Sequence, residues 1–485
     1  MGHRTEAPRT RGARLVANTA VFTVGKFVSK LLVFFMMRLY TTCLSTSEYS
    51  TVDLIVNMAN LLIPLACLGI GEGIFRSVAS KTGDKEAFFT NGLCILGVGF
   101  VAFLALSPLL SFIPMFTGTA WLIVLYVIAS NFHAVVSQYL CAVGDTKLFA
   151  GQGILNTVLV IALNIVFLPV LDMGVKGYVL SIILADALTT LFLIVYRRVW
   201  RAVKPRTVSW RVMSSMLRFC LPLIPATVFW WITGVSDRYM VAYMVSPREN
   251  GLYAAAYKVP TLLIYVVSIF DSAWKLSVSE EDGADDKKRL AEQGKFFSGV
   301  WRMYATVAFL GGAALILGCR LFAGVLYAKE FSSAWIYIPI LTTATVYTAL
   351  DTFLGSVYYA SRRTVGSMLT ALTGAVLNLI LNLLLIPKFG AMGASVATFA
   401  SYFAVFIIRL VSAPRYIPFE REMLRNTANT ALLCILTVTV TMTDRGHAVV
   451  WWCVSAVVAL CMLLINIRAV MDICRSAWRL VRRKR

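Results

Sequence analysis

Two lysines stand four residues apart inside an otherwise apolar stretch near the start of the 485-residue chain. On a helix, Lys26 and Lys30 would lie one turn apart, with both ammonium groups on the same face. No acidic residue occurs in that stretch to neutralise them. Two like charges placed in this way repel each other unless an anion lies between them, or unless the side chains reach out to a polar surface. We therefore predict that the pair binds an anion.

A second charged group lies in the middle of the chain. Asp237 and Arg238 stand in one apolar stretch and Lys258 in the next, at a similar distance from the short segment between them. One interpretation is an ion pair of Asp237 with Lys258 that fixes two helices together. Arg238 would then be left to bind a phosphate through two parallel hydrogen bonds.

Aromatic residues accompany these charges. Trp230 and Trp231 lie nearer the centre of their apolar stretch than the aromatic residues that anchor helices at a membrane surface. Together with Tyr239 they are candidates for stacking on sugar rings.

Acidic residues inside apolar stretches need a cation, a proton or a basic partner, because an isolated charge in a membrane is costly. The candidates for coupling or gating are Asp53, Asp237, Asp271 and Asp351. Asp186 is a weaker candidate, and His133 is either a proton site or a hydrogen-bonded core residue. The ten cysteines show no CxxC or other ligand-like spacing and are interpreted as small residues that face lipid or the core. We also predict no metal site, no catalytic residue and no cofactor.

The composition indicates which kind of scaffold positions these groups. The chain is 59% hydrophobic and 14% charged, whereas soluble domains are about 45–50% apolar and about 25% charged. Apolar runs of 20 or more residues recur along the whole length, enough to cross a hydrocarbon layer of ~30 Å as helices. These features exclude a cytosolic enzyme, a secreted domain and a nucleic-acid-binding protein. They predict an all-α polytopic membrane protein.

We expect about fourteen spans, and the loop charges orient them. If the N-terminus is cytoplasmic, 34 of the 45 lysines and arginines fall in cytoplasmic segments and seven in external ones. This bias agrees with the positive-inside rule, so both termini are expected in the cytoplasm, with the first span retained rather than cleaved. The spans run roughly over 15–40, 51–75, 88–112, 119–142, 151–171, 175–197, 217–245, 252–277, 296–318, 334–360, 366–386, 391–412, 426–443 and 448–470.

Spans 4–6 repeat as spans 10–12. Sliding the chain by 218 residues places Leu163-Asn164 on Leu381-Asn382 and Pro169 on Pro387, and after a two-residue gap Gly174-x-x-Gly177 falls on Gly390-x-x-Gly393. A repeat unit of six spans gives parallel halves, which is a transporter architecture with its substrate between the halves near the midplane. We expect an N-lobe over 1–200, a C-lobe over 201–415, and two extra spans with a basic cytoplasmic tail over 416–485.

Several groups of residues along the chain match the motifs of one known family. They are Asn18-Thr19, Gly25-Lys26, Leu39-Tyr40-Thr41, Glu48-Tyr49, Asp53-Leu54, Leu221–Pro225, Asp237–Tyr239, Gly251-x-Tyr253, Ala256-Tyr257-Lys258, and Asn378 to Pro387 followed by Gly390 and Gly393. The chain resembles the bacterial polysaccharide flippases of the multidrug/oligosaccharidyl-lipid/polysaccharide exporter superfamily over spans 1–12.

This resemblance implies alternating access by two six-helix lobes. The implied substrate is an oligosaccharide on a polyprenyl diphosphate, carried across the cytoplasmic membrane for cell-surface polysaccharide synthesis. Its partners would be membrane lipids, Na⁺ or H⁺, and the glycan polymerase and glycosyltransferases of the same pathway. By analogy with lipid II flippases, spans 13 and 14 would line a groove for the prenyl tail. The diphosphate would be bound by Lys26, Lys30, Arg238 and Lys258.

Two other functions remain open at this point. A cation-coupled multidrug antiporter of the same fold needs acids in its central cavity, and Asp237 and Asp351 are compatible with that role although the first span is cationic. A membrane glycan polymerase or glycosyltransferase needs catalytic acids, usually on a large outer loop, and the expected outer loops are short. We therefore expect a flippase and not an enzyme.

Overall fold

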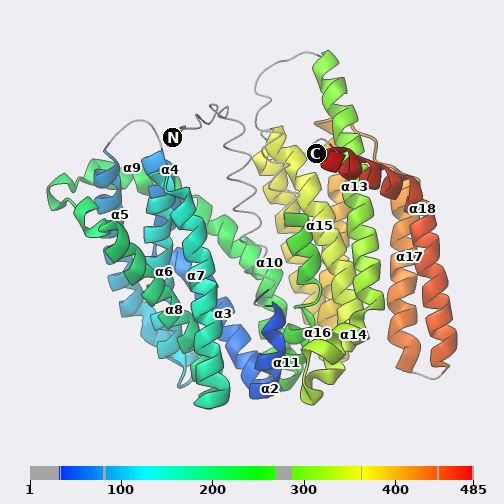
Figure 1. Cartoon of the computed structure of the whole chain (residues 1–485), viewed down its shortest axis with the longest axis horizontal. Coiled ribbons are helices and arrows are strands. Elements are labelled where there is room, and N and C mark those ends of the chain that lie inside the picture. The colour runs from blue at the N-terminus through cyan, green and yellow to red at the C-terminus, as the bar shows by residue number, and fades with distance from the viewer. Residues whose placement is uncertain are drawn as a thin grey trace, which may run out of the picture. The chain divides into compact units, whose positions relative to one another are not determined.

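The computed structural model describes residue 32 and residues 34–79, 84–268, 287–361, 363–444 and 447–482 (Figure 1). Every regular element in these ranges is a helix, which confirms the expected all-α class. The chain divides into two compact units. Unit 1 comprises Met1–Leu44 and Thr51–Trp231, and unit 2 comprises Ser45–Ser50 and Ile232–Arg485. The lobe boundaries expected at residues 200 and 415 stay a prediction.

Unit 1 is built around a core in which α4 and α6 meet. Phe89 of α5 stacks on Tyr139 of α6 with ring centroids 4.1 Å apart, and Ile70 and Ile74 of α4 are fully buried in the same core. Its described helices are α2 (Met37–Cys43), α3 (Thr46–Ala66, from Thr51), α4 (Ile70–Ala79), α5 (Lys85–Leu106), α6 (Ala120–Ala142), α7 (Thr146–Ile165), α8 (Gly174–Arg197), α9 (Trp210–Cys220) and the start of α10 (Leu223–Met244).

The second expected span, 51–75, is broken into α3 and α4 rather than continuous. Pro64 stands near the end of α3 and cannot donate a helical hydrogen bond. Leu68 and Gly69 then adopt left-handed backbone angles, with φ of 50° and 67°, which end a right-handed helix. The chain becomes helical again at Ile70, where α4 begins.

Unit 2 buries large aromatic side chains on α13 and α15. Trp301 lies 5.4 Å from Phe353, measured between ring centroids, and both are fully buried. Its described helices are the end of α10, α11 (Pro247–Ala256), α13 (Lys287–Leu317), α14 (Cys319–Leu326), α15 (Ile338–Ala360), α16 (Thr364–Ser412), α17 (Met423–Thr441) and α18 (Ala448–Arg482).

Twelve stretches of the described chain are long and apolar enough to cross a membrane. Eleven correspond to one expected span each, and Val365–Arg415 covers two. These two meet inside α16 at Gly390, whose φ of 58° interrupts the helix. The first expected span, 15–40, lies mostly outside the described residues. The polytopic membrane architecture is thus confirmed for spans 2–14.

The internal repeat is visible in the helix boundaries. Helices α6 and α15 both have 23 residues and begin and end 218 positions apart, and α7 and α16 also begin 218 positions apart. The matched Gly174 and Gly390 both have positive φ, 52° and 58°.

The matched glycines that follow also serve the same packing contact. A Cβ on Gly177 would lie 3.1 Å from the Phe167 carbonyl oxygen, and one on Gly393 would lie 2.4 Å from that of Leu385. Since Phe167 and Leu385 are also 218 positions apart, each repeat uses a glycine to let the same two backbone segments approach.

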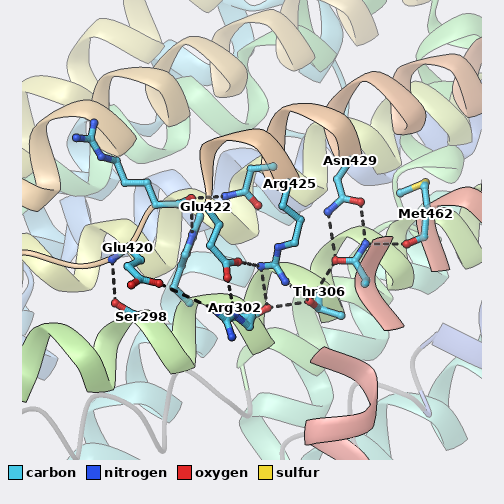
Figure 2. Close-up of polar contacts among 12 residues, drawn as sticks. Ser298, Arg302, Thr306, Glu420, Glu422, Arg425, Asn429 and Met462 are labelled. Carbon is cyan, nitrogen blue, oxygen red and sulfur yellow. Dashed lines mark hydrogen bonds and ion pairs between the residues drawn. The ribbon is translucent and has the colours of Figure 1, made fainter. Parts of the chain in front are cut away.

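The last two spans are fastened to α13 by buried amides. Asn466 of α18 donates to the Asn429 oxygen at 2.8 Å, and Asn429 of α17 donates back at 3.3 Å. The hydroxyl of Thr306 on α13 also donates to Asn466, at 3.3 Å. Three helices therefore share one polar contact, and Figure 2 shows it as the end of a longer chain of interactions.

At the other end of that chain, Glu422 lies between two arginines (Figure 2). Its carboxylate accepts from Arg302 Nε and pairs with Arg425, each at 2.5 Å. Arg425 also donates to Thr306 at 3.2 Å. These ion pairs link the start of α17 to α13.

We expect the Asn429–Asn466 contact to stabilise this three-helix assembly by about 1 kcal/mol, the range for polar contacts between membrane helices. Asn466→Leu leaves the Asn429 amide without its partner and should lower the thermal unfolding temperature of the detergent-solubilised protein. Asn429→Leu should do the same, and the double variant should lose less than the sum of the two. Additive losses would show that the two amides do not interact.

Candidate functional site

Three of the residues expected at the site, Lys26, Lys30 and Asp271, lie outside the described residues. Trp230 belongs to α10, but its side chain is also outside the described part of the chain. Their roles stay predictions. The remaining candidates fall into two groups, one in each unit.

In unit 2, the Asp237 carboxylate is held by groups from three helices. It lies on α10 and is 2% exposed. Its Oδ2 accepts from the Tyr253 hydroxyl of α11 at 2.6 Å and from Thr398 of α16 at 3.3 Å. Its Oδ1 accepts from the backbone N–H of Arg238 at 2.8 Å. A buried carboxylate is satisfied here by neutral donors and a backbone amide.

These contacts replace the ion pair that we expected between Asp237 and Lys258. Within the described residues, the hydrogen bonds of Asp237 go to Tyr253, Thr398 and the Arg238 amide. Tyr253 is on α11, whereas Lys258 follows the end of that helix at Ala256. The face of α11 turned toward Asp237 therefore presents a phenol.

The Arg238 side chain lies against an aromatic ring. Its guanidinium carbon is 4.8 Å from the centroid of Tyr257, within the range of a cation–π interaction. Tyr402 of α16 interacts electrostatically with Arg238, with Asp237 and with Asp351.

Asp351 on α15 is buried, with 6% of its surface exposed. Its Oδ1 has no hydrogen-bond partner among the described residues. Arg409 donates to the backbone oxygen of Asp351 at 2.8 Å and uses its Nε for Thr370 at 3.0 Å. A carboxylate oxygen left open in this way is suited to take a proton or a cation.

In unit 1, Asn57 connects two of the expected residues. Its amide donates to the Asp53 carboxylate at 3.1 Å, and its backbone oxygen accepts from the Trp231 indole N–H at 2.7 Å. Asp53 and Asn57 are one turn apart on α3, and Trp231 is on α10. The acid and the tryptophan, far apart in sequence, therefore belong to one polar group.

Sequence reasoning assigned no role to several residues that surround Asp237. Asn378 donates to Thr398 at 3.5 Å, and Asn382 donates to the Asn378 oxygen at 2.9 Å. Their spacing could have indicated this group, because two asparagines at i and i+4 in an apolar helix share one face. Together with Thr398 and Asp237 they form a row of oxygen and amide groups across α10 and α16. No cluster of three metal-ligating His, Cys, Asp or Glu occurs among the described residues.

Three solved structures with a similar fold share only 13–15% sequence identity with this chain. Lipid II flippase MurJ in an inward closed conformation has a TM-score of 0.68 and 13% identity, covering 94% of this chain and 99% of that one. An inward-facing multidrug resistance MATE family transporter of the MOP superfamily has a TM-score of 0.66 and 15% identity, covering 83% and 96%. A MOP superfamily transporter from Pyrococcus furiosus has a TM-score of 0.58 and 15% identity, covering 85% and 95%. These matches establish the fold.

Family membership rests on the sequence. No curated protein matches the chain. A family model described as "Polysaccharide biosynthesis protein" matches residues 15–274, more than half of the chain, and includes Lys26, Arg238 and Lys258. The chain therefore belongs to this polysaccharide biosynthesis protein family.

Proposed function

We propose that the chain carries polyprenyl-diphosphate-linked oligosaccharide units across the cytoplasmic membrane by alternating access. This proposal depends mainly on one observation. The Arg238 guanidinium, in the expected seventh span, lies over the Tyr257 ring in a chain of a polysaccharide biosynthesis family. The fold similarity to a lipid II flippase supports it. The transported unit would serve cell-surface polysaccharide synthesis.

The chemistry of the candidate residues fits such a cargo. A diphosphate needs cations, and Lys26, Lys30, Arg238 and Lys258 supply them from apolar stretches where a charge is otherwise costly. A planar guanidinium can bind two phosphate oxygens at once. The sugars would lie against the aromatic residues Trp230, Trp231 and Tyr239, while the prenyl tail stays in lipid.

We also propose that buried carboxylates couple transport to Na⁺ or H⁺. Asp237 lies among oxygen and amide groups of α11 and α16, and Asp351 has an open carboxylate oxygen. Binding of a cation at either acid would change the charge around Tyr402 and Arg238. Asp53 and Asp271 are candidates for gating in the same proposal.

In this proposal the chain moves its cargo without making or breaking a covalent bond. Glycosyltransferases that build the unit and a glycan polymerase that uses it would act before and after transport. The loop charges favour an orientation with both termini in the cytoplasm.

Replacing Arg238 tests whether its guanidinium binds the diphosphate of the cargo. In proteoliposomes loaded with a polyprenyl-diphosphate oligosaccharide, Arg238→Gln should slow transport about tenfold or more, the effect of losing a charge-assisted hydrogen bond worth about 1.5–3 kcal/mol. Transport is measured as the glycan that becomes accessible to a membrane-impermeant lectin. Arg248→Gln, on the exposed start of α11, is the matched control and should transport at the normal rate.

The double variant Lys26→Gln, Lys30→Gln should also transport the glycan slowly. Normal rates in both sets of variants would exclude a cationic diphosphate site, and export of cationic dyes in place of the glycan would favour the multidrug antiporter.

Asp237→Asn tests the coupling proposal. It keeps the side-chain shape but removes the charge, so transport by this variant should no longer respond to an imposed Na⁺ or H⁺ gradient. The rate should equal that of the unmodified protein without a gradient. Asp472→Asn, at an exposed aspartate of α18, should keep the full response. If transport by the Asp237→Asn variant still responds to the gradient, the coupling ion does not bind at this residue.

Reporter fusions test the proposed orientation. A reporter fused after Val208, in the exposed segment between α8 and α9, should read as cytoplasmic. One fused after Lys329, in the exposed segment between α14 and α15, should read as external. The reverse result at both sites would place the termini outside the cell. The same reading at both sites would show that the number of spans between them is not the expected one.

A further inference from the structure

A histidine in unit 1 contacts oxygen atoms with both of its ring nitrogens. His133 lies on α6, with its side chain 18% exposed. Its Nδ1 is 3.3 Å from Oδ1 of Asp186 on α8. Its Nε2 is 2.6 Å from Oε1 of Gln152 on α7. One imidazole thus joins three helices.

This geometry requires a particular protonation state. A neutral imidazole carries one N–H donor and one acceptor nitrogen, whereas an imidazolium carries two donors. Two oxygen acceptors at hydrogen-bond or ion-pair distance are both satisfied only when both nitrogens bear a proton. The alternative is a rotated Gln152 amide, which would donate its NH₂ to a neutral ring.

The surroundings of Asp186 stabilise it as an anion. The Ser130 hydroxyl donates to its Oδ2, and the Asn156 amide of α7 donates to its Oδ1 at 2.8 Å. With His133, three donors from α6 and α7 converge on this one carboxylate of α8. A carboxylate bonded in this way keeps its charge and pairs with a protonated histidine.

Other ionisable groups near the pair are few within the described residues. Tyr126 of α6 interacts electrostatically with Asp186 and with Tyr178 of α8, and Asp53 of α3 acts on Tyr178. The helices α4 and α5 also pack against α6. Their ionisable side chains include Glu72, Arg76, which lies over the Phe219 ring, Lys85, and Glu86, which pairs with Lys204.

The repeat places a related group in unit 2, with the charges reversed. Shifting by 218 positions carries His133 to Asp351 and Gln152 to Thr370. In unit 2, Arg409 contacts both of these residues. Its guanidinium donates to the backbone oxygen of Asp351 and to the hydroxyl of Thr370. Arginine keeps its proton throughout the physiological pH range, whereas histidine does not. The basic residue of the unit 1 group can therefore exchange a proton near neutral pH, whereas the basic residue of the unit 2 group keeps its proton.

We propose that His133, Gln152 and Asp186 form a proton-binding site in unit 1. The bound proton completes the second N–H of His133, so that α6 is tied to α7 and α8 at once. When the proton leaves, the ring has one donor for two acceptors, and one of these two contacts is lost. This site is separate from the carboxylates of unit 2 and does not depend on which cargo the protein carries.

The chain has only three histidines, which makes the site open to direct measurement. With His3→Asn and His447→Asn, His133 is the sole imidazole, and asparagine tolerates the positive φ of residue 447. In nitrogen-15 spectra of this full-length protein in lipid nanodiscs at pH 7.5, both ring nitrogens should be protonated. A free histidine is about 90% neutral at that pH.

Asp186→Asn in the same background should convert the ring to the neutral form. The matched control is Asp145→Asn, which removes the ion pair of Asp145 with Arg197 in the same unit and should leave His133 doubly protonated. A singly protonated ring in the parent protein at pH 7.5 would overturn the proposal, and this measurement does not depend on whether the Asp186 variant folds. Equal spectra for the parent and a folded Asp186→Asn variant would overturn it as well.

Discussion

The hydrocarbon of a lipid bilayer offers no hydrogen-bond partners, so an unpaired polar group inside a span is costly and most such groups bond within the protein. This constraint explains the helices, and it also explains where they meet. The amides of Asn429 and Asn466 bond each other across α17 and α18, Tyr253 bonds Asp237 across α11 and α10, and Asp186 gathers donors from two neighbouring helices. Polar side chains that are rare in such a composition therefore fix the packing of otherwise similar apolar surfaces.

The same constraint made most of the fold predictable from sequence. A span must be long and apolar, so hydropathy alone located spans 2–14. The repeat followed from an asparagine, a proline and two glycines at matched positions, and Gly174 and Gly390 have the positive φ that such positions need. Hydropathy does not report backbone angles, however. The break between α3 and α4 depends on left-handed conformations at Leu68 and Gly69, which an apolar sequence does not reveal.

The candidate site was less predictable, because a pattern on one helix does not say which face of its neighbour lies opposite. The sequence showed that Asp237 needed a partner, and charge suggested Lys258. The structure instead places the phenol of Tyr253 there, with Thr398 from a helix far along the chain. In the same way, Asp53 and Trp231 could each be recognised as unusual, but the Asn57 that links them carries no signal of its own. The sequence therefore identified charged residues in apolar stretches, where a charge is costly, but it did not identify the neutral residues that bond to them.

The two related polar groups show how much of this chemistry the fold dictates. Equivalent helix positions hold His133 in unit 1 and Asp351 in unit 2, and each is accompanied by a residue of opposite charge, Asp186 or Arg409. Matching helix boundaries in α6 and α15 show that the helices accept either sign at this place. The shared packing therefore accommodates an ionisable residue at this place but does not determine which residue it is. Because a histidine can lose its proton near neutral pH whereas an arginine cannot, the choice of residues makes the basic group of unit 1 responsive to pH on helices that both units share.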